Sequence, residues 1–250
     1  MASVSWGKDS LAMLLRLINE NKPLDEVVFF DTGMEFQAIY NVRNSVLGML
    51  KVRGITYTEL KPSKPFLYTM LEKPVKGSER KGYGWCGGLC RWGTTEKLKA
   101  LDRYAKSKSA IMYVGIAADE VKRLDRLQSY KISPLVTYWD MTEADCLQYC
   151  YDRHYYWYED AGNEAIKIRL YDVLDRVSCW CCCNKNIKEL RNIYRFLPEY
   201  WQKLRYLQSA IERPMKGYYK GQPKGIFELE ERFSKEVNND TVGCLWKRGN

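Results

Sequence analysis

Hydrophobic and polar residues alternate in blocks along the first 150 residues, and the blocks have the lengths of strands and helices. The short apolar stretch ASVS leads through a polar turn into the helical pattern DSLAMLLRLINEN. The apolar run DEVVFF is followed by a second helical pattern, AIYNVRNSVLGMLKVRG, and then by ITYTEL. Short apolar runs that alternate with amphipathic helices predict an α/β fold, with a parallel twisted sheet and helices on both faces.

The alternation resumes after a loop-rich stretch at residues 61–92. TTEKLKALDRYAKS predicts a helix capped by Thr94 or Thr95, and SAIMYVGIAADE predicts a buried strand that ends in a polar turn. KISPLVTYW is expected to form a strand and MTEADCLQYCYDR a helix capped by Thr142. Ligands of such sheets bind at the carboxyl ends of the strands, where the strand order switches.

From about residue 185 the pattern becomes helical. Residues 186–213 predict two helices broken near Pro198, and residues 223–236 predict a third. We therefore expect a nucleotide-binding α/β domain at residues 1–184 and a C-terminal helical extension at residues 185–250.

Composition narrows the class of protein. The 250 residues include 40 basic and 31 acidic residues, a net charge of +9 that favours a nucleotide or nucleic-acid partner. No run of apolar residues approaches the length of a membrane span, and residues 1–15 lack the pattern of a secretory signal. The expected location is cytoplasmic, with no membrane partner.

The polar turn after the first apolar stretch reads SWGKDS, residues 5–10. Backbone N–H groups at a helix N-terminus are unpaired and the helix dipole favours negative charge there, so a turn of this composition is suited to an anion. Gly7 would let the backbone approach phosphate oxygens closely, and Ser5 and Ser10 would offer hydroxyl groups. The other interpretation is an ordinary helix start with Asp9 and Ser10 as capping residues.

The turn also resembles the pyrophosphate loop of the PP-loop ATP pyrophosphatases, S-G-G-x-D-S, in the form S-[FW]-G-K-D-S of the phosphoadenosine phosphosulfate (PAPS) reductase-like family. Further segments are similar to that family in the same order, over residues 3–205. They are FFDTGMEF, KGYGWCGGLCRWGTTEK, VGIAADEVKR, SPLVTYWDMTEADC and RVSCWCCCNKNIKELRNIYRFLPEYWQKL. The resemblance implies a PP-loop fold of the adenine nucleotide alpha hydrolase type.

The resemblance implies that the loop binds the phosphates of ATP, or of a related adenylyl nucleotide, together with Mg²⁺. Lys8 would neutralise phosphate charge and Asp9 would hold the loop or help to ligate Mg²⁺, so both are assigned to catalysis. The residues expected to bind nucleotide are Ser5, Trp6, Gly7, Lys8, Asp9, Ser10, Asp31, Thr32, Gly33, Gly115, Asp119 and Arg123. For Asp31–Gly33, Gly115 and Asp119, the other interpretation is a simple strand-to-helix turn.

Basic residues are frequent in the segments that border this expected site: Lys76, Arg80, Lys81, Arg91, Lys97, Arg123 and Arg126. Each alone has the character of a solvated surface charge. As a set they predict an anionic second substrate, because arginine donates two hydrogen bonds at once to phosphate or sulfate.

Nine cysteines are many for a chain without a secretory signal, and they favour metal binding or redox chemistry over disulfides. Four thiolates from a C-x3-C and a C-x-x-C segment have the count and spacing of a zinc or cluster site. The expected ligands are Cys86, Cys90, Cys179 and Cys182, and Cys181 or Cys183 could replace Cys182. The remaining interpretation is a set of buried free thiols.

Spacing alone does not separate Zn²⁺ from a [4Fe–4S] cluster, but several members of the resembled family carry the cluster, which favours iron–sulfur. The chain departs from that family where Gly93 stands in place of a frequent cysteine, and Cys90 could take over the role of that ligand. Cys146 and Cys150, four residues apart in a helical pattern, are expected to fill core space as small hydrophobic residues.

Two further residues, Cys244 and His154, bear on the chemistry. Cys244 occupies the place of the nucleophilic cysteine of sulfonucleotide reductases, but the acidic residue before it and the histidine after it are absent, so an incidental cysteine is the other interpretation. His154 is the only histidine, which leaves little basis for a histidine metal centre or a His/Asp hydrolase. Its aromatic run, RHYYWYED, is expected to pack in a core or at an interface.

Three functions remain open. The first is adenylation of a substrate by ATP with release of pyrophosphate, followed by transfer of sulfur from a sulfur-donor protein. The second is reduction of a sulfonucleotide (APS or PAPS) by a thiol, with Cys244 and a thioredoxin-like partner. The third is a nucleic-acid-associated protein with a regulatory nucleotide site. The acceptor could be tRNA, DNA or a small molecule.

Overall fold

The computed structural model describes residues 1–86, 90, 95–162 and 166–246, with side chains described as far as residue 236. Contacts divide the chain into two compact units. Unit 1 comprises residues 1–65, 91–158 and 177–179, and unit 2 comprises residues 66–90, 159–176 and 180–250. The sequence places one boundary at residue 184, whereas in the structure residues 66–90 and 159–176 belong with the C-terminal helices.

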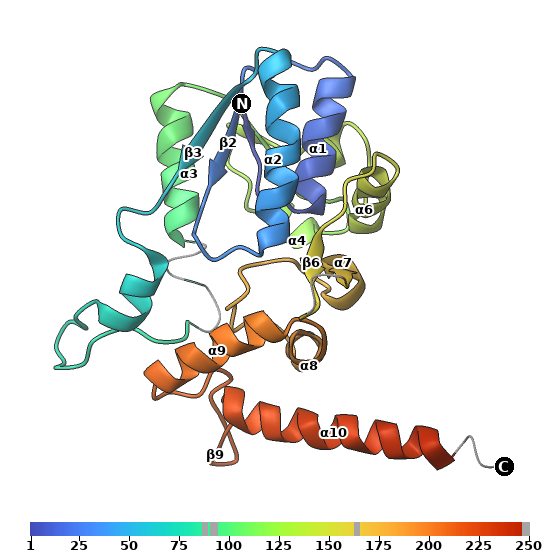
Figure 1. Cartoon of the computed structure of the whole chain (residues 1–250). Helices are drawn as coiled ribbons and strands as arrows, with labels where there is room; N and C mark the ends of the chain where they lie inside the picture. The colour runs from blue at the N-terminus through green and yellow to red at the C-terminus, as the bar shows by residue number, and fades with distance from the viewer. Residues whose placement is uncertain (87–89, 91–94, 163–165, 247–250) are drawn as a thin grey trace. The chain divides into compact units, whose positions relative to one another are not determined.

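Unit 1 is a parallel sheet covered by helices on both faces (Figure 1). Its strands are β1 (Ala2–Ser3), β2 (Glu26–Phe30), β3 (Thr56–Leu60), β4 (Met112–Val114) and β5 (Lys131–Ile132). Its helices are α1 (Lys8–Asn19), α2 (Gln37–Val52), α3 (Thr95–Ser107), α4 (Val121–Leu124), α5 (Pro134–Thr137) and α6 (Glu143–Tyr151). The predicted α/β class is confirmed.

The strand order β3-β2-β1-β4-β5 contains the feature that positions a site. The chain builds outward from β1 through β2 to β3, then returns to the other side of β1 to form β4 and β5. In register, Ala2 pairs with Val27 on one side and with Tyr113 on the other. The order therefore switches between β1 and β4, and their carboxyl ends flank the place where such sheets bind ligands.

The side chains of β2 show what covers each face of the sheet. Val28 and Phe30 pack against Leu101 and Ala105 of α3. Phe29 points to the opposite face, where its ring meets that of Trp6 at 6.4 Å. Because both faces of β2 are apolar, its sequence reads as a continuous hydrophobic run, as expected for a strand covered on both sides.

One predicted strand is wrong in most of its length. The segment 131–139 forms only a two-residue strand, Lys131–Ile132, and then the short helix Pro134–Thr137. Pro134 occupies the first turn of that helix, where its missing N–H costs no hydrogen bond and its fixed φ suits helical geometry. Pro134 therefore ends the strand pairing between β4 and β5, which the apolar residues after it would otherwise continue.

Unit 2 consists mainly of helices with small two-stranded sheets. Its elements are the π-helix η1 (Tyr68–Glu72), α7 (Leu170–Val173), α8 (Ile187–Phe196), α9 (Pro198–Ala210) and α10 (Ile226–Trp246), with the strand pairs β6 (Tyr158–Asp160) and β7 (Lys167–Arg169), and β8 (Tyr218–Tyr219) and β9 (Gln222–Pro223). The two helices broken at Pro198 and the third after residue 223 are confirmed.

An aromatic cluster joins the three long helices of unit 2. The ring of Trp201 on α9 lies 5.2 Å from that of Tyr194 on α8 and 5.9 Å from that of Phe233 on α10. Edge-on and tilted ring pairs at such distances stabilise a core beyond their buried area. The C-terminal helices are therefore packed together by large apolar side chains.

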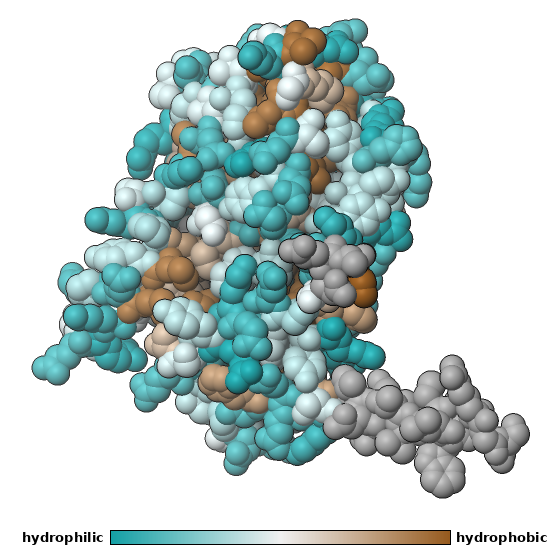
Figure 2. All heavy atoms as spheres, viewed as in Figure 1, coloured by the Kyte–Doolittle hydropathy of each residue, from teal (hydrophilic) through white to brown (hydrophobic). Residues whose placement is uncertain are grey.

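The surface is mostly polar on the face drawn in Figure 2, with hydrophobic residues in separate patches. Among the described residues, no helix combines the length and the apolar character that crossing a membrane requires.

Candidate nucleotide site and cysteine cluster

The loop that leaves β1 has an unusual backbone. Trp6 adopts a left-handed conformation, with φ at 62°, although its side chain is fully buried against Phe29 and Tyr57. Such a backbone costs a non-glycine residue about 1 kcal/mol or more, so the surroundings must hold it. The indole N–H of Trp157 donates a 2.7 Å hydrogen bond to the carbonyl oxygen of Trp6 and supplies part of that restraint.

Helix α1 begins without a side-chain cap. Gly7 is its N-cap residue, in an extended conformation with φ at −79° and ψ at 168°, and it forms no side-chain capping hydrogen bond. The first-turn N–H groups of a helix carry the positive end of its dipole. The loop therefore directs this end of α1 to the carboxyl edge of the sheet.

Ser5 and Ser10 hold the loop in shape. The Oγ of Ser10 accepts a 3.1 Å bond from the backbone N–H of Ser5 and donates one of 3.1 Å to the carbonyl of Gly7. The two serine hydroxyls also lie 3.1 Å apart. In this structure the predicted serines are bonded to one another and to the loop backbone, so they fix the position of its N–H groups.

Gly115 brings the end of β4 against the start of α1. A Cβ atom built on Gly115 would lie 2.7 Å from Ser10 Cα and 2.8 Å from Ser10 N. These are backbone atoms that cannot swing aside. Only glycine allows this close approach. The contact places the end of β4 beside the loop that follows β1, at the switch point between these two strands.

Lys8 carries a buried charge at the start of α1. Its ammonium nitrogen lies 2.9 Å from Asp9 Oδ1 and 2.7 Å from Glu143 Oε2. Burial alone would lower the pKa of Lys8, but the two carboxylates outweigh burial and raise it. Burial raises the pKa of Asp9, and the negative charges of Glu143 and Glu120 add to this, against the opposing effect of Lys8.

One acidic partner of Lys8, Glu143, is held by a residue that follows β4. Asp119 accepts a 3.1 Å hydrogen bond from the backbone N–H of Glu143, the first residue of α6. Arg123 forms an ion pair with Glu120 and is half exposed. Glu143 and Glu120 were not expected as site residues from the sequence. The signal available was weak, because a glutamate in the first turn of a helix ordinarily serves only the dipole.

The Asp31–Thr32–Gly33 segment lies at the carboxyl end of β2. Asp31 Oδ1 accepts hydrogen bonds from the Gly33 backbone at 2.8 Å and from the hydroxyl of Tyr40 at 2.7 Å. Burial and this bond to Asp31 raise the pKa of Tyr40 far above its usual range, so it stays a donor. Gly33, with φ at 73°, takes the left-handed conformation that a tight turn needs.

Thr32 is buried and connects that segment to a cysteine of the same unit. It donates a 3.2 Å bond to Glu35 Oε1, and its Oγ1 lies 3.8 Å from Cys179 Sγ. Cys179 Sγ is 4.0 Å from the same Glu35 oxygen.

Every residue expected to bind nucleotide is in unit 1. Direct contacts link the Ser5–Ser10 loop with Gly115 and, through Glu143, with Asp119.

The other expected cysteine ligands, Cys86, Cys90 and Cys182, are in unit 2. Cys183 Sγ donates a hydrogen bond of 2.7 Å to the carbonyl of Cys86. Burial raises the pKa of the Cys183 thiol to about 11, and the neighbouring thiol groups of Cys182, Cys86 and Cys90 add to the shift. Lys216 donates to the carbonyls of Cys183 and Lys185, at 2.7 and 2.9 Å.

The donor chemistry of these four thiols suits zinc or an iron–sulfur cluster. However, within the described residues no three His, Cys, Asp or Glu side chains are gathered as ligands around one point. Cys181, one of the two replacements considered for Cys182, is buried. Cys183, the other, lies among the thiols of unit 2.

Some predicted residues lie outside the part of the chain that the structure describes, and for others the burial of the side chain tests the prediction. Gly93 and Arg91 lie outside the described residues, and Cys244 lies on α10 where side chains are not described. Cys146 and Cys150 are fully buried, which confirms the core role expected for them. Trp157, from the aromatic run beside His154, is buried as predicted.

The basic residues predicted to surround the site divide between the units. Lys76, Arg80 and Lys81 belong to unit 2, whereas Lys97, Arg123 and Arg126 belong to unit 1. The prediction that they serve one anionic substrate therefore stays a prediction.

A comparison with protein families matches residues 1–154 to the phosphoadenosine phosphosulfate reductase domain. The chain belongs to this family. The resemblance seen in the loop and in the later segments is confirmed as far as residue 154, whereas the segment RVSCWCCCNKNIKELRNIYRFLPEYWQKL lies beyond the match, so its resemblance stays a prediction.

A curated relative extends the similarity beyond the domain. The uncharacterized protein MJ0066 of Methanocaldococcus jannaschii is 25% identical over 218 residues, which cover 81% of this chain and 40% of the relative. The chain therefore spans about two-fifths of the length of that relative.

Proposed function

We propose that this PAPS reductase family chain binds ATP, or a related adenylyl nucleotide, at the loop between β1 and α1 and uses it for adenylation-dependent sulfur transfer. The observation that carries the proposal is the start of α1: an uncapped helix N-terminus, a buried lysine and a glycine contact meet at the switch point of the sheet. Family membership supports an adenylyl nucleotide as the anion.

In the proposed reaction, a substrate oxygen attacks the α-phosphorus of ATP and the bond to the β-phosphate oxygen breaks. Pyrophosphate leaves, and the substrate carries AMP on that oxygen. The first-turn N–H groups of α1 and the ammonium of Lys8 would stabilise the negative charge that collects on the departing pyrophosphate. Asp9 and Glu143 would orient Lys8, and Asp9 is also the proposed ligand of the Mg²⁺ that accompanies ATP.

In the second half of the reaction, a sulfur nucleophile attacks the activated carbon and AMP leaves with the oxygen. The cysteines proposed to bind a [4Fe–4S] cluster, in preference to Zn²⁺, are Cys86, Cys90, Cys179 and Cys182, with Cys181 or Cys183 in place of Cys182. Such a cluster would supply an iron atom that binds sulfur. Asp31, Thr32 and Gly33 would contact the ribose and adenine, and Asp119 and Arg123 would complete the nucleotide site from the β4 side.

The first test is calorimetry with ATP, a non-hydrolysable ATP analogue, APS and PAPS. The protein is prepared without oxygen, and its absorption spectrum and its iron, zinc and sulfide contents are measured in parallel. We expect affinity for at least one adenylyl nucleotide and a Mg²⁺-dependent release of pyrophosphate when acceptor and sulfur donor are present. Failure to bind any adenosine compound would exclude the proposal.

A second candidate is thiol-dependent reduction of APS or PAPS, which the description of the family domain favours. Here a cysteine thiolate would attack the sulfur of the sulfonucleotide, AMP or its 3′-phosphate would leave, and a thioredoxin-like dithiol would release sulfite. Sulfite release that is lost in Cys244→Ser would support this reaction. Pyrophosphate release from ATP that survives in Cys244→Ser would support sulfur transfer instead.

A further inference from the structure

A short hairpin in unit 2 presents two tyrosines to solvent. Strands β8 and β9 pair Tyr218 with Pro223 and Tyr219 with Gln222. Tyr218 and Tyr219 are 64% and 58% exposed. We call residues 213–224 the tyrosine hairpin; its second strand carries the label β9 in Figure 1.

The tyrosine hairpin has a fixed backbone. Its two turn residues, Lys220 and Gly221, both have positive φ, at 49° and 77°, as in the tight turns that match the twist of paired strands. The base is closed by hydrogen bonds from Lys216 N to Lys224 O at 2.9 Å and from Lys224 N to Gly217 O at 2.8 Å. The exposed rings therefore stand on a closed hairpin.

A buried glutamine of α9 anchors this hairpin to the helices. The side-chain amide of Gln208 donates to the carbonyls of Ile211 and Arg213, at 2.8 and 3.1 Å. Its carbonyl oxygen accepts from Met215 N at 2.9 Å and from Ile226 N at 3.3 Å. One side chain thus bonds both the chain entering the hairpin and the chain leaving it.

The charge of the tyrosine hairpin has one sign. Residues 213–224 contain Arg213, Lys216, Lys220 and Lys224 and no acidic residue. Lys224 Nζ lies 4.4 Å and Lys220 Nζ 5.7 Å from the centre of the Tyr219 ring. Glu212, which is exposed, lies directly before the hairpin. The nearest acidic residue after it, Glu228, is bonded to the backbone N–H of Gly225 at 2.8 Å.

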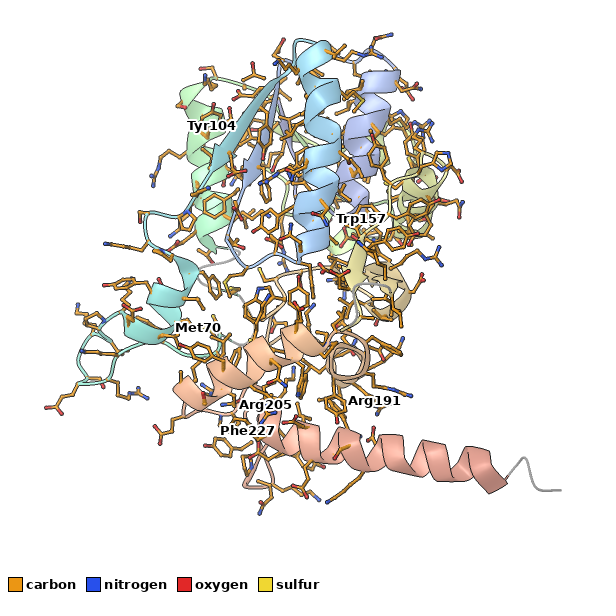
Figure 3. All side chains as sticks on the ribbon, in the orientation of Figure 1. Met70, Tyr104, Trp157, Arg191, Arg205 and Phe227 are labelled. Carbon is orange, nitrogen blue, oxygen red and sulfur yellow. The ribbon has the colours of Figure 1, made fainter. Side chains whose placement is uncertain are left out.

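A similar pairing of ring and cation occurs beside the hairpin at the start of α10. Phe227 is 43% exposed, and the guanidinium carbon of Arg205 on α9 lies 6.0 Å from its ring centre. Arg205 also forms an ion pair of 3.4 Å with Glu230. Figure 3 shows the two labelled side chains from neighbouring helices of this unit. Tyr206, the residue after Arg205, is also exposed.

Exposed aromatic rings interleaved with lysine and arginine have the chemistry of a surface that binds single strands of nucleic acid. Bases stack on the rings, and the cations follow the phosphates. In a duplex the bases are already stacked on each other and would not reach two adjacent tyrosines. We infer that the tyrosine hairpin is a docking surface for a single-stranded nucleic acid, a function beyond the nucleotide chemistry proposed for unit 1.

The test is fluorescence anisotropy of the full chain with a labelled 20-nucleotide oligouridylate, over a series of salt concentrations. A deoxythymidylate strand and a duplex of equal length are the comparison ligands. We expect Tyr218→Ala/Tyr219→Ala to weaken binding of the single strand at least about tenfold, because each stacked base contributes about fivefold or more. Lys220→Ala/Lys224→Ala should lower the slope of log affinity against log salt by about 1.4.

Matched controls separate the hairpin from general basicity and from the nucleotide site. Tyr138→Ala removes an exposed tyrosine of unit 1, and Lys51→Ala/Lys99→Ala removes two exposed lysines there. These variants should keep the affinity of the wild-type chain for the single strand. The hairpin variants should keep its affinity for adenylyl nucleotide in calorimetry, which distinguishes a failure of this inference from a failure of the proposed function.

A second measurement does not depend on the variants. Photocrosslinking with a 4-thiouridine strand, followed by mass spectrometry, should place the crosslinks within residues 206–227. Equal binding by the tyrosine variant and the wild-type chain, tighter binding to the duplex, or crosslinks confined to unit 1 would each overturn the inference.

Discussion

Helices α1 and α6 pack against each other in unit 1, and their first residues, Lys8 and Glu143, are joined by a 2.7 Å bond. The two helices differ in how their N-termini are capped. At α6, Thr142 and Asp145 form a capping box in which each side chain bonds the backbone of the other. At α1, a glycine occupies the capping position and no side chain caps the turn.

The difference separates a structural helix end from one suited to a ligand. The capping box satisfies the backbone N–H groups of Thr142 and Asp145, and Asp119 accepts a hydrogen bond from the N–H of Glu143, so these groups already have partners. At α1 the same groups have no side-chain cap, while a buried lysine and the close approach of Gly115 add charge and rigidity. Within unit 1, then, the uncapped helix end is the one that the proposed function assigns to phosphate.

The largest effect is expected from Gly115→Ala. The added methyl group would overlap the backbone of Ser10 and push the start of α1 away from β4, at a cost of about 1–3 kcal/mol in the free energy of unfolding. We expect nucleotide affinity in calorimetry to fall at least about a hundredfold, because the loop N–H groups would move together.

The control for this change is Gly48→Ala, inside α2, where a Cβ would meet nothing within 4 Å. This variant should be slightly more stable, by up to about 1 kcal/mol, because alanine favours a helix over glycine. Wild-type nucleotide binding by Gly115→Ala would show that α1 is not the binding element.

Lys8→Met should weaken nucleotide binding by about 10- to 100-fold, since a buried hydrogen bond from a charged donor to phosphate would be lost. The change also leaves Asp9 and Glu143 without their shared cation, so thermal denaturation should show a lower stability. Lys51→Met, an exposed lysine of α2, is the matched control and should change neither property. If both lysine variants bind equally well, the charge of Lys8 has no role in binding.

Capping α1 artificially tests the comparison directly. Gly7 has a backbone conformation that any residue can adopt, so Gly7→Asp places a capping carboxylate at the end of the helix. We expect the helix to be unharmed in circular dichroism and nucleotide affinity to fall about tenfold or more, through competition for the N–H groups and repulsion of phosphate. Gly7→Ser, which caps without charge, should have the smaller effect; the reverse order would contradict the assignment.

Thr142→Ala is the opposite experiment, at the capped helix. Loss of the capping box should cost about 1 kcal/mol in the free energy of unfolding measured with denaturant. Nucleotide affinity should change about twofold or less, because Asp119 still holds the backbone of Glu143. A loss of affinity as large as that of Lys8→Met would mean that the cap itself supports the site.

The smallest expected effect is on the pH dependence of stability. Because the pKa of Asp9 is raised above its ordinary value of 3.8, the folded chain binds this proton more tightly than the unfolded chain does. Its contribution to stability is therefore greatest at low pH and is lost as the pH rises from 3.8 through the raised pKa. Unfolding of Asp9→Asn, measured across this range, should lack that part of the slope; an unchanged slope would contradict the shift.

Much of unit 1 follows from local patterns in the sequence. The apolar run before Asp31 and the amphipathic helices on either side contain enough periodicity to predict β2, α1 and α2. The cap at Thr142 is predicted because serine and threonine accept bonds at helix starts. The segment after Ile132 is mispredicted because apolar residues suit either a strand or a helix, and Pro134 decides for the helix.

The contacts of the site depend on long-range packing that no local pattern contains. Glu143 meets Lys8 only because α6 lies against α1, and Gly115 meets Ser10 only because β4 lies beside β1. The residues expected from motifs, such as Asp31 and Gly33, occupy the ends of strands as predicted. The spacing of the cysteines does not determine which of them act together, because the run from Cys179 to Cys183 allows several sets of ligands. In addition, Cys179 belongs to unit 1 whereas Cys181, Cys182 and Cys183 belong to unit 2.

The bond from Trp157 to the carbonyl of Trp6 ties the first loop of the chain to a residue 151 positions later. During synthesis, the amino-terminal segment is therefore complete in sequence long before the partner that restrains it has emerged. The loop proposed to bind nucleotide would acquire its restrained shape only after Trp157, which follows α6 in the sequence, has bonded to it. A fragment that stops before Trp157 should therefore contain the motif but bind nucleotide poorly.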